Sequence, residues 1–176
     1  YHIQVTGIHS YPDPIAAVNR AEAILVGGGN TFQLIKMMQE QGLIRAIRER
    51  VLYGGVPYAG WSAGSNVACP TICTTNDMPV VEPQSFEAFG FVPYQINPHY
   101  LDAHPEGHGG ETREQRILEY IAANPGRYVV GLREGCRLFV DDKGTRLVGD
   151  KPARIFKYGE APREVAPGAS LDFLYQ

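Results

Sequence analysis

Residues 56–64 have the sequence Val-Pro-Tyr-Ala-Gly-Trp-Ser-Ala-Gly, and this segment decides the fold. Its apolar start, residues 56–59, predicts a short buried strand, and a helix is expected to begin near Ala63. Between them, Ser62 lies in the pattern Gly-x-Ser-x-Gly, which is typical of a sharp strand-to-helix turn that exposes a nucleophile. The helix after such a turn directs its free N–H groups at the serine. The segment therefore predicts an α/β fold, with Ser62 as the nucleophile and the N–H of Ala63 as an oxyanion donor.

Strands and helices alternate on both sides of this segment, and residues 70–93 between them predict a loop. The apolar patterns predict strands at 23–26, 94–96 and 128–132, helices at 31–41, 43–52 and 112–123, and C-terminal hairpin strands at 138–140, 146–148, 154–158 and 163–165. Such alternation is typical of a three-layer fold, in which a mainly parallel sheet has helices on both faces. We expect residues 1–176 to form one such domain, with the hairpins at one edge.

The composition excludes several classes of protein. The formal charge of −3 over 176 residues gives no electrostatic signal of a nucleic-acid or membrane partner. No apolar run approaches the roughly 18 residues of a membrane span, and no secretory leader is visible. The three cysteines, Cys69, Cys73 and Cys136, are too few for a disulfide framework and lack the second ligand pair of a zinc site. We therefore expect a cytoplasmic protein that needs no metal and no organic cofactor.

A serine hydroxyl needs a base to become an effective nucleophile. Among the five histidines, His99 follows a predicted strand and a proline that restricts its backbone, so it is the candidate base. The other four are assigned to surface positions: His2, His9, His104 and His108. The base in turn needs an acidic partner. Glu134, which follows the next strand, is the first candidate, and Asp77 in the loop is the alternative; a dyad without an acid, or another acid, stays open.

The glycine-rich segment 27–30 lies between a predicted strand and a predicted helix. It has neither the spacing of a dinucleotide-binding loop nor the lysine of a P-loop. Glycines allow the backbone to approach another group closely. A second oxyanion donor is therefore expected from Gly28, Gly29 or Asn30, with a phosphate-binding loop as the alternative.

Taken together, the motifs resemble the peptidase E family of serine peptidases, the α-aspartyl dipeptidases. The matching stretches are Val26-Gly-Gly-Gly-Asn-Thr-Phe-Gln-Leu34, Gly60-Trp-Ser-Ala-Gly64, Cys69-Pro-Thr71, Thr74-Thr-Asn-Asp-Met-Pro79, Gln95-Ile-Asn-Pro-His99, Pro105-Glu-Gly-His108 and Gly110-Glu-Thr-Arg-Glu-Gln-Arg-Ile117. The resemblance implies a fold similar to class I glutamine amidotransferases, with serine in place of their cysteine. It also implies that the early strands of the family's sheet precede Tyr1 and are absent from this chain.

The resemblance further implies the activity, which is hydrolysis of dipeptides that begin with aspartate. It assigns the nucleophile, base and acid to Ser62, His99 and Glu134, and leaves Asp77 as a second position for the acid. The substrate is a small acidic dipeptide, and the protein is expected to be a monomer or homodimer. A cyanophycinase-like peptidase, another hydrolase of the superfamily, or a non-catalytic module that binds small ligands are the alternatives.

An aspartate side chain in a substrate calls for a fixed cation, and arginine binds carboxylates with two hydrogen bonds. Arg113 matches the family's substrate-binding arginine, whereas Arg116 is interpreted as pairing on the surface. The loop with Thr75, Asn76 and Asp77 is expected to hold the charged ends of the substrate. Charge complementarity alone suggests that Asp77 faces the free α-amino group.

Overall fold

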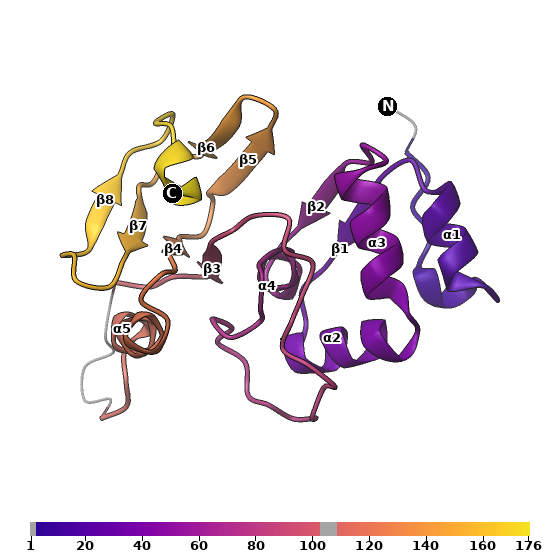
Figure 1. The fold of residues 1–176 in the computed structure, drawn as a ribbon, viewed down its shortest axis with the longest axis horizontal. Coiled ribbons are helices and arrows are strands. Elements are labelled where there is room, and N and C mark those ends of the chain that lie inside the picture. Colours follow the sequence, from indigo (N-terminus) through magenta and orange to yellow (C-terminus); the bar gives the residue numbers. More distant parts are fainter. Residues whose placement is uncertain (1–2, 103–108) are drawn as a thin grey trace.

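A computed structural model describes residues 3–102 and 109–176 (Figure 1). The elements in chain order are η1 (Ile8–Ser10), α1 (Pro14–Arg20), β1 (Ile24–Val26), α2 (Thr31–Glu40), α3 (Leu43–Leu52), β2 (Tyr58–Gly60), α4 (Ala63–Ala68), β3 (Gln95–Pro98), α5 (Arg113–Ala123), β4 (Val129–Leu132), β5 (Arg137–Asp141), β6 (Gly144–Val148), β7 (Ala153–Phe156), β8 (Arg163–Val165) and η2 (Asp172–Tyr175). In Figure 1 the N-terminal half lies on the right and the C-terminal half on the left, with α4 and β3 between them.

The strands and helices predicted from the sequence are confirmed, with shifts of one or two residues at their ends. Three short elements were not predicted: η1, α1 and η2. Helix α1 had a visible signal, because Asp13 caps it by accepting a hydrogen bond from Ala16 N and Pro14 occupies its first turn.

The single, mainly parallel sheet predicted from the sequence is wrong for the described residues, whose strands form three sheets. β1 and β2 form a parallel pair, in which Ile24 lies opposite Tyr58. β3 and β4 are also parallel, but β7 and β8 extend that sheet in the antiparallel sense, and β5 and β6 form a separate hairpin. The sequence thus predicted the parallel pairs and the C-terminal hairpins, but not their division into three sheets.

The separation of the β1–β2 pair from the sheet that contains β3 has a local cause, which lies at the edge of β3 that pairs with no strand of the described residues. The segment that follows α4 runs along this edge and binds it through side chains rather than as a strand. The Ile96 N–H donates to Cys69 Sγ at 3.2 Å, and Thr74 Oγ1 donates to the Ile96 carbonyl at 2.9 Å. Asn97 Nδ2 donates to the Thr74 carbonyl at 2.9 Å. Because these groups occupy the edge of β3, β2 does not pair with it.

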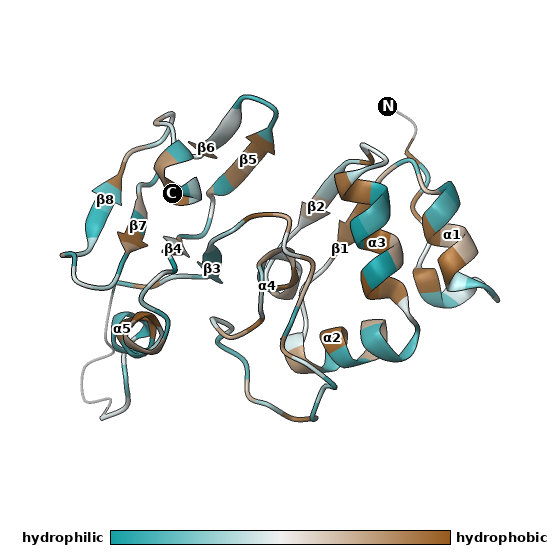
Figure 2. Ribbon diagram, in the orientation of Figure 1, coloured by the Kyte–Doolittle hydropathy of each residue, from teal (hydrophilic) through white to brown (hydrophobic). Residues whose placement is uncertain are grey.

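The prediction of helices on both faces is also wrong for the β1–β2 pair. Ile24 and Val26 point into a core that they share with α2, α3 and α4. Leu25 points the other way, and 51% of it is exposed. Helices therefore cover one face of this pair. In Figure 2 each of α2, α3 and α5 carries both apolar and polar residues, as expected for helices that bury one side.

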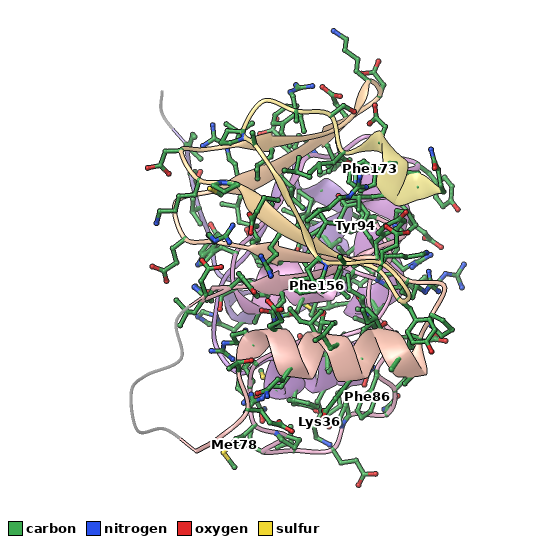
Figure 3. All side chains as sticks on the ribbon, turned by 90° about the vertical axis from the view of Figure 1, so that its left-hand side faces the viewer. Lys36, Met78, Phe86, Tyr94, Phe156 and Phe173 are labelled. Atoms are coloured by element: carbon green, nitrogen blue, oxygen red, sulfur yellow. The ribbon has the colours of Figure 1, made fainter. Side chains whose placement is uncertain are left out.

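The C-terminal half has its own core beneath β4 and β7. Phe156 and Val129 pack against Ile117 and Ile121 of α5, and Figure 3 shows α5 lying below Phe156. Tyr100 belongs to the same cluster and is 2% exposed. This packing fixes the start of α5 and the turn after β3, the two places from which Arg113 and His99 extend.

Candidate active site

Ser62 lies on the turn between β2 and α4 with an unusual backbone conformation. Its φ of 57° and ψ of −116° fall in a region that L-residues rarely occupy. The turn is tight, because a Cβ at Gly60 would overlap the carbonyl oxygen of Gly64, and one at Gly64 would overlap the carbonyl oxygen of Val26. The two glycines of the motif are therefore required by close backbone approach, and Ser62 lies on a strained turn of the kind often found at functional sites.

Replacing Gly64 with alanine is expected to destabilise the protein by about 3 kcal/mol, since overpacking of this kind typically costs 1–3 kcal/mol and more when backbone must move. The added methyl group would push α4 away from β1. Gly126→Ala is the control, because no atom lies within 4 Å of a Cβ at Gly126. Chemical denaturation of both variants measures the difference, and equal stabilities would contradict the packing argument.

The glycine segment after β1 lies against the same turn. A Cβ at Gly28 would be 3.1 Å from the Cβ of Ser62, so only glycine brings the backbone this close without displacing a neighbour. Gly29 has a φ of 133°. Asn30 caps α2 by accepting from Gln33 N, and its Nδ2 donates to the Met78 carbonyl. The side chain of Asn30 is thus engaged, which leaves backbone N–H groups as the oxyanion donors to be considered from this segment.

Ala63 is the first residue of α4, so its N–H has no acceptor within the helix. This N–H and the glycine segment lie next to Ser62, which is the arrangement predicted for an oxyanion hole.

His99 follows β3 directly and also has a positive φ, of 54°. Among residues 3–102 and 109–176, Ser62 and His99 are the two non-glycine positions with positive φ. The turn that carries His99 is held by the neighbouring loop, because Asn76 Nδ2 donates to the Pro98 carbonyl at 2.9 Å. Strain at both predicted reactive residues is consistent with a functional site.

Glu134 follows β4, the strand paired with β3, and it contacts His99. The distance between His99 Nδ1 and Glu134 Oε1 is 2.9 Å. A carboxylate can only accept, so Nδ1 carries the proton, and in the neutral imidazole Nε2 is then the acceptor. This is the tautomer that a base for a serine hydroxyl requires.

Asp77, the alternative acid, is engaged elsewhere. Its Oδ2 accepts from Thr31 N at 2.7 Å, from Thr31 Oγ1 at 2.6 Å and from Thr75 Oγ1 at 3.1 Å. Thr31 is the first residue of α2, so the carboxylate also lies at the positive end of that helix. The geometry therefore favours Glu134 over Asp77 as the partner of His99.

Arg113 is the first residue of α5, behind a capping box formed by Thr112 and Gln115. A cation at a helix N-terminus is electrostatically unfavourable, unless an anion binds there. Burial lowers the pKa of Arg113 from its ordinary value, the neighbouring Arg116 lowers it further, and Asp77 acts in the opposite direction. Within the described parts of the chain, no ion pair involves Arg113. Arg116, in contrast, pairs with Glu111 at 3.5 Å, which agrees with its predicted surface role.

One pocket, of about 220 Å³, brings most of these side chains together. It is lined by Ser62, Asn66, Thr75, Asn76, Asp77, Pro98, His99 and Arg113. The sequence prediction missed Pro98 and Asn66, although Asn66 lies four residues after Ser62 on the same side of α4, a spacing that could have identified it. Pockets for drug-sized ligands are typically about 300–1,000 Å³, so this one suits a smaller molecule.

Some of the predicted residues lie outside the described ones. His2, His104 and His108 belong to this group, as does the motif Pro105–His108. Among the described residues, no cluster of three or more His, Cys, Asp or Glu side chains is arranged to hold a metal ion. In the same part of the chain, no helix is long and apolar enough to cross a membrane.

Comparison with known proteins places the chain among peptidases. Residues 1–148 match the family model of peptidase family S51. The peptidase E of Nostoc sp. (strain PCC 7120 / SAG 25.82 / UTEX 2576) is 51% identical over 169 residues, which are 96% of this chain and 69% of that protein. The peptidase E of Escherichia coli O1:K1 / APEC is 52% identical over 158 residues, which are 90% of this chain and 69% of that protein.

A crystal structure of a candidate peptidase E from Listeria monocytogenes EGD-e shares the fold. It aligns with a TM-score of 0.50 and 21% sequence identity, covering 86% of this chain and 64% of that one. The chain thus spans less than two thirds of that structure, and about two thirds of the curated relatives.

The α/β fold, the serine elbow and these matches define a serine-type peptidase. The chain belongs to peptidase family S51. This confirms the family resemblance predicted from the sequence motifs.

Proposed function

We propose that the chain hydrolyses dipeptides with an N-terminal aspartate, through a Ser62–His99–Glu134 triad and an acyl-enzyme. The observation that carries the proposal is the shared pocket of Ser62, His99, Arg113 and Asp77. The pocket combines a serine on a strained turn, a histidine whose Nδ1 is held by a carboxylate, one positively charged side chain and one negatively charged side chain. Relatives at 51–52% identity are named peptidase E, which supports the same activity.

In this mechanism His99 Nε2 accepts the hydroxyl proton of Ser62 as the oxygen attacks the aspartyl carbonyl. Glu134 stabilises the imidazolium that forms. The N–H of Ala63 and an N–H of the segment with Gly28 and Gly29 donate to the oxyanion. His99 then protonates the leaving amine, and a water molecule that it activates hydrolyses the ester.

Substrate charge explains the rest of the pocket. A dipeptide with N-terminal aspartate presents a side-chain carboxylate and an α-ammonium group close to the scissile bond. Arg113 and the N-terminus of α5 would bind the carboxylate. Asp77, whose Oδ2 is fixed by α2, would attract the ammonium group, with Thr75 and Asn76 beside it. The volume of about 220 Å³ favours a dipeptide over a protein segment.

We propose that the β1–β2–α4 unit corresponds to that of the class I glutamine amidotransferases, although the described strands, which form three sheets, do not reproduce their three-layer fold as a whole. The parallel β1–β2 pair and the elbow between β2 and α4 support this assignment.

Arg113→Met is expected to lower kcat/KM for Asp-Leu roughly 100-fold, because loss of a buried charge-assisted contact costs about 3 kcal/mol. Arg116→Met is the matched control, since Arg116 lies three residues further along α5 and pairs with Glu111. Steady-state assays of both variants on Asp-Leu measure the effect. Equal losses in the two variants, or no loss with Arg113→Met, would argue against aspartate recognition by Arg113.

A further inference from the structure

An arginine connects the two segments that hold the proposed base and acid. Arg133 directly precedes Glu134, and Asp102 lies three residues after His99. Arg133 Nε donates to Asp102 Oδ2 at 2.8 Å, and Arg133 Nη2 donates to Asp102 Oδ1 at 2.7 Å. We call such a pair of parallel hydrogen bonds from one guanidinium to one carboxylate a fork. Unlike a single contact, a fork fixes both the distance and the orientation of the two groups.

The guanidinium is held from its other side as well. Arg133 Nη1 donates to Glu164 Oε2 at 2.8 Å and Nη2 donates to Glu164 Oε1 at 2.9 Å, from β8. Arg133 Nη1 also donates to the Pro152 carbonyl. The Arg133 side chain is 12% exposed, whereas Asp102 and Glu164 are 60% and 39% exposed, so the guanidinium is buried against the protein while both carboxylates reach solvent. The hydrogen bonds of Arg133 lower the pKa of Asp102 and of Glu164.

The contact between His99 and Glu134 needs such support. Their side chains are 49% and 72% exposed, and exposed pairs contribute little to holding a geometry. Each residue lies just beyond the end of its strand, past the last paired residues, Pro98 and Leu132. One further backbone bond, from Tyr100 N to the Leu132 carbonyl at 3.1 Å, continues the pairing. Beyond it, the fork between Arg133 and Asp102 links the two segments.

We propose that Arg133 is a positioning residue, which through its fork to Asp102 holds Glu134 at hydrogen-bond distance from His99. The inference rests on the proposed roles of His99 and Glu134. Arg133 touches neither substrate nor reacting atoms in this scheme; it acts through the segments on both sides. The fork to Asp102 joins the two site segments, whereas the fork to Glu164 attaches Arg133 to β8.

The two carboxylates that share Arg133 provide a matched test. Asp102→Asn leaves one acceptor oxygen and no charge for Arg133, so it breaks the two-bond geometry between the site segments and is expected to lower kcat on Asp-Leu roughly 10-fold with KM nearly unchanged, since a displacement of about 1 Å can cost up to 100-fold. Glu164→Gln breaks the two-bond geometry to β8 in the same way and is expected to lower the melting temperature while kcat stays within about twofold. Equal kcat losses in both variants, or an unchanged kcat in Asp102→Asn, would overturn the proposal.

A second measurement needs no turnover. Nitrogen-15 NMR of protein labelled at histidine reports the tautomer of neutral His99. The His99 signals are assigned by their absence from the spectrum of a His99→Gln variant. The Nδ1–H tautomer is expected in the wild type and in Glu164→Gln. A mixture with the Nε2–H tautomer is expected in Asp102→Asn, as in a Glu134→Gln reference. If Asp102→Asn keeps the wild-type tautomer, Arg133 does not position Glu134. If the wild type fails to cleave Asp-Leu while the tautomers behave as expected, the proposed substrate fails and the positioning role stands.

Discussion

Replacing Ser62 with alanine is expected to lower kcat on Asp-Leu on the order of 10⁶-fold, as removal of the nucleophile does in other serine peptidases. The hydroxyl is the atom that forms the acyl-enzyme, and the strained turn presents it to the pocket. Release of leucine from Asp-Leu measures the loss, and a fluorophosphonate probe should no longer label the variant.

Ser65→Ala serves as the control for this substitution. Ser65 lies one turn further along α4, and its Oγ donates to the Gly60 carbonyl at 3.3 Å rather than lining the pocket. Its removal is expected to leave activity within about twofold, since a single exchangeable hydrogen bond contributes only about 1 kcal/mol to stability. Substantial turnover by Ser62→Ala would show that another group forms the acyl-enzyme, and would remove the basis of the proposed mechanism.

Glu134→Gln is expected to lower kcat on the order of 10⁴-fold, because a neutral amide neither selects the Nδ1–H tautomer of His99 nor stabilises the imidazolium. Asp77→Asn should act differently. Its carboxylate is bound by Thr31 and Thr75, so the change should raise KM for Asp-Leu and lower the melting temperature, while kcat falls much less. Steady-state kinetics and melting curves of the two variants separate these roles. A larger kcat loss in Asp77→Asn than in Glu134→Gln would reassign the acid to Asp77.

The sequence was most informative where local chemistry decides the structure. The Gly-x-Ser-x-Gly pattern between an apolar run and a helix places Ser62 on a strand-to-helix turn, and the structure shows that a Cβ at Gly60 or Gly64 would overlap the backbone there. Position in the sequence pairs His99 with Glu134, in agreement with the family resemblance: each follows a strand, and neighbouring parallel strands end at the same edge. Such arguments need only short-range patterns.

The sequence patterns do not predict how strands and loops that are far apart in the chain are arranged relative to one another. All four residues of β3 are buried, although Gln95 and Asn97 are polar, and this pattern does not tell whether a neighbouring strand or a set of side chains covers the edge of β3. Here Cys69 and Thr74 cover it, and they lie in a loop without periodicity. Likewise, the continuous apolar run of β1 predicts a fully buried strand and does not reveal that Leu25 is 51% exposed. The fork of Arg133 joins residues 31 positions apart, which no local pattern connects.

The left-handed backbone at Ser62 and His99 has an evolutionary consequence. Sparsely populated conformations of this kind cost of order 1–3 kcal/mol each, a noticeable part of the 5–15 kcal/mol that keeps a typical domain folded. Selection for thermal stability alone would favour glycine at both positions, and each replacement would remove a reactive side chain. Variants chosen for heat resistance should therefore gain it elsewhere in the chain, as long as hydrolysis is selected at the same time.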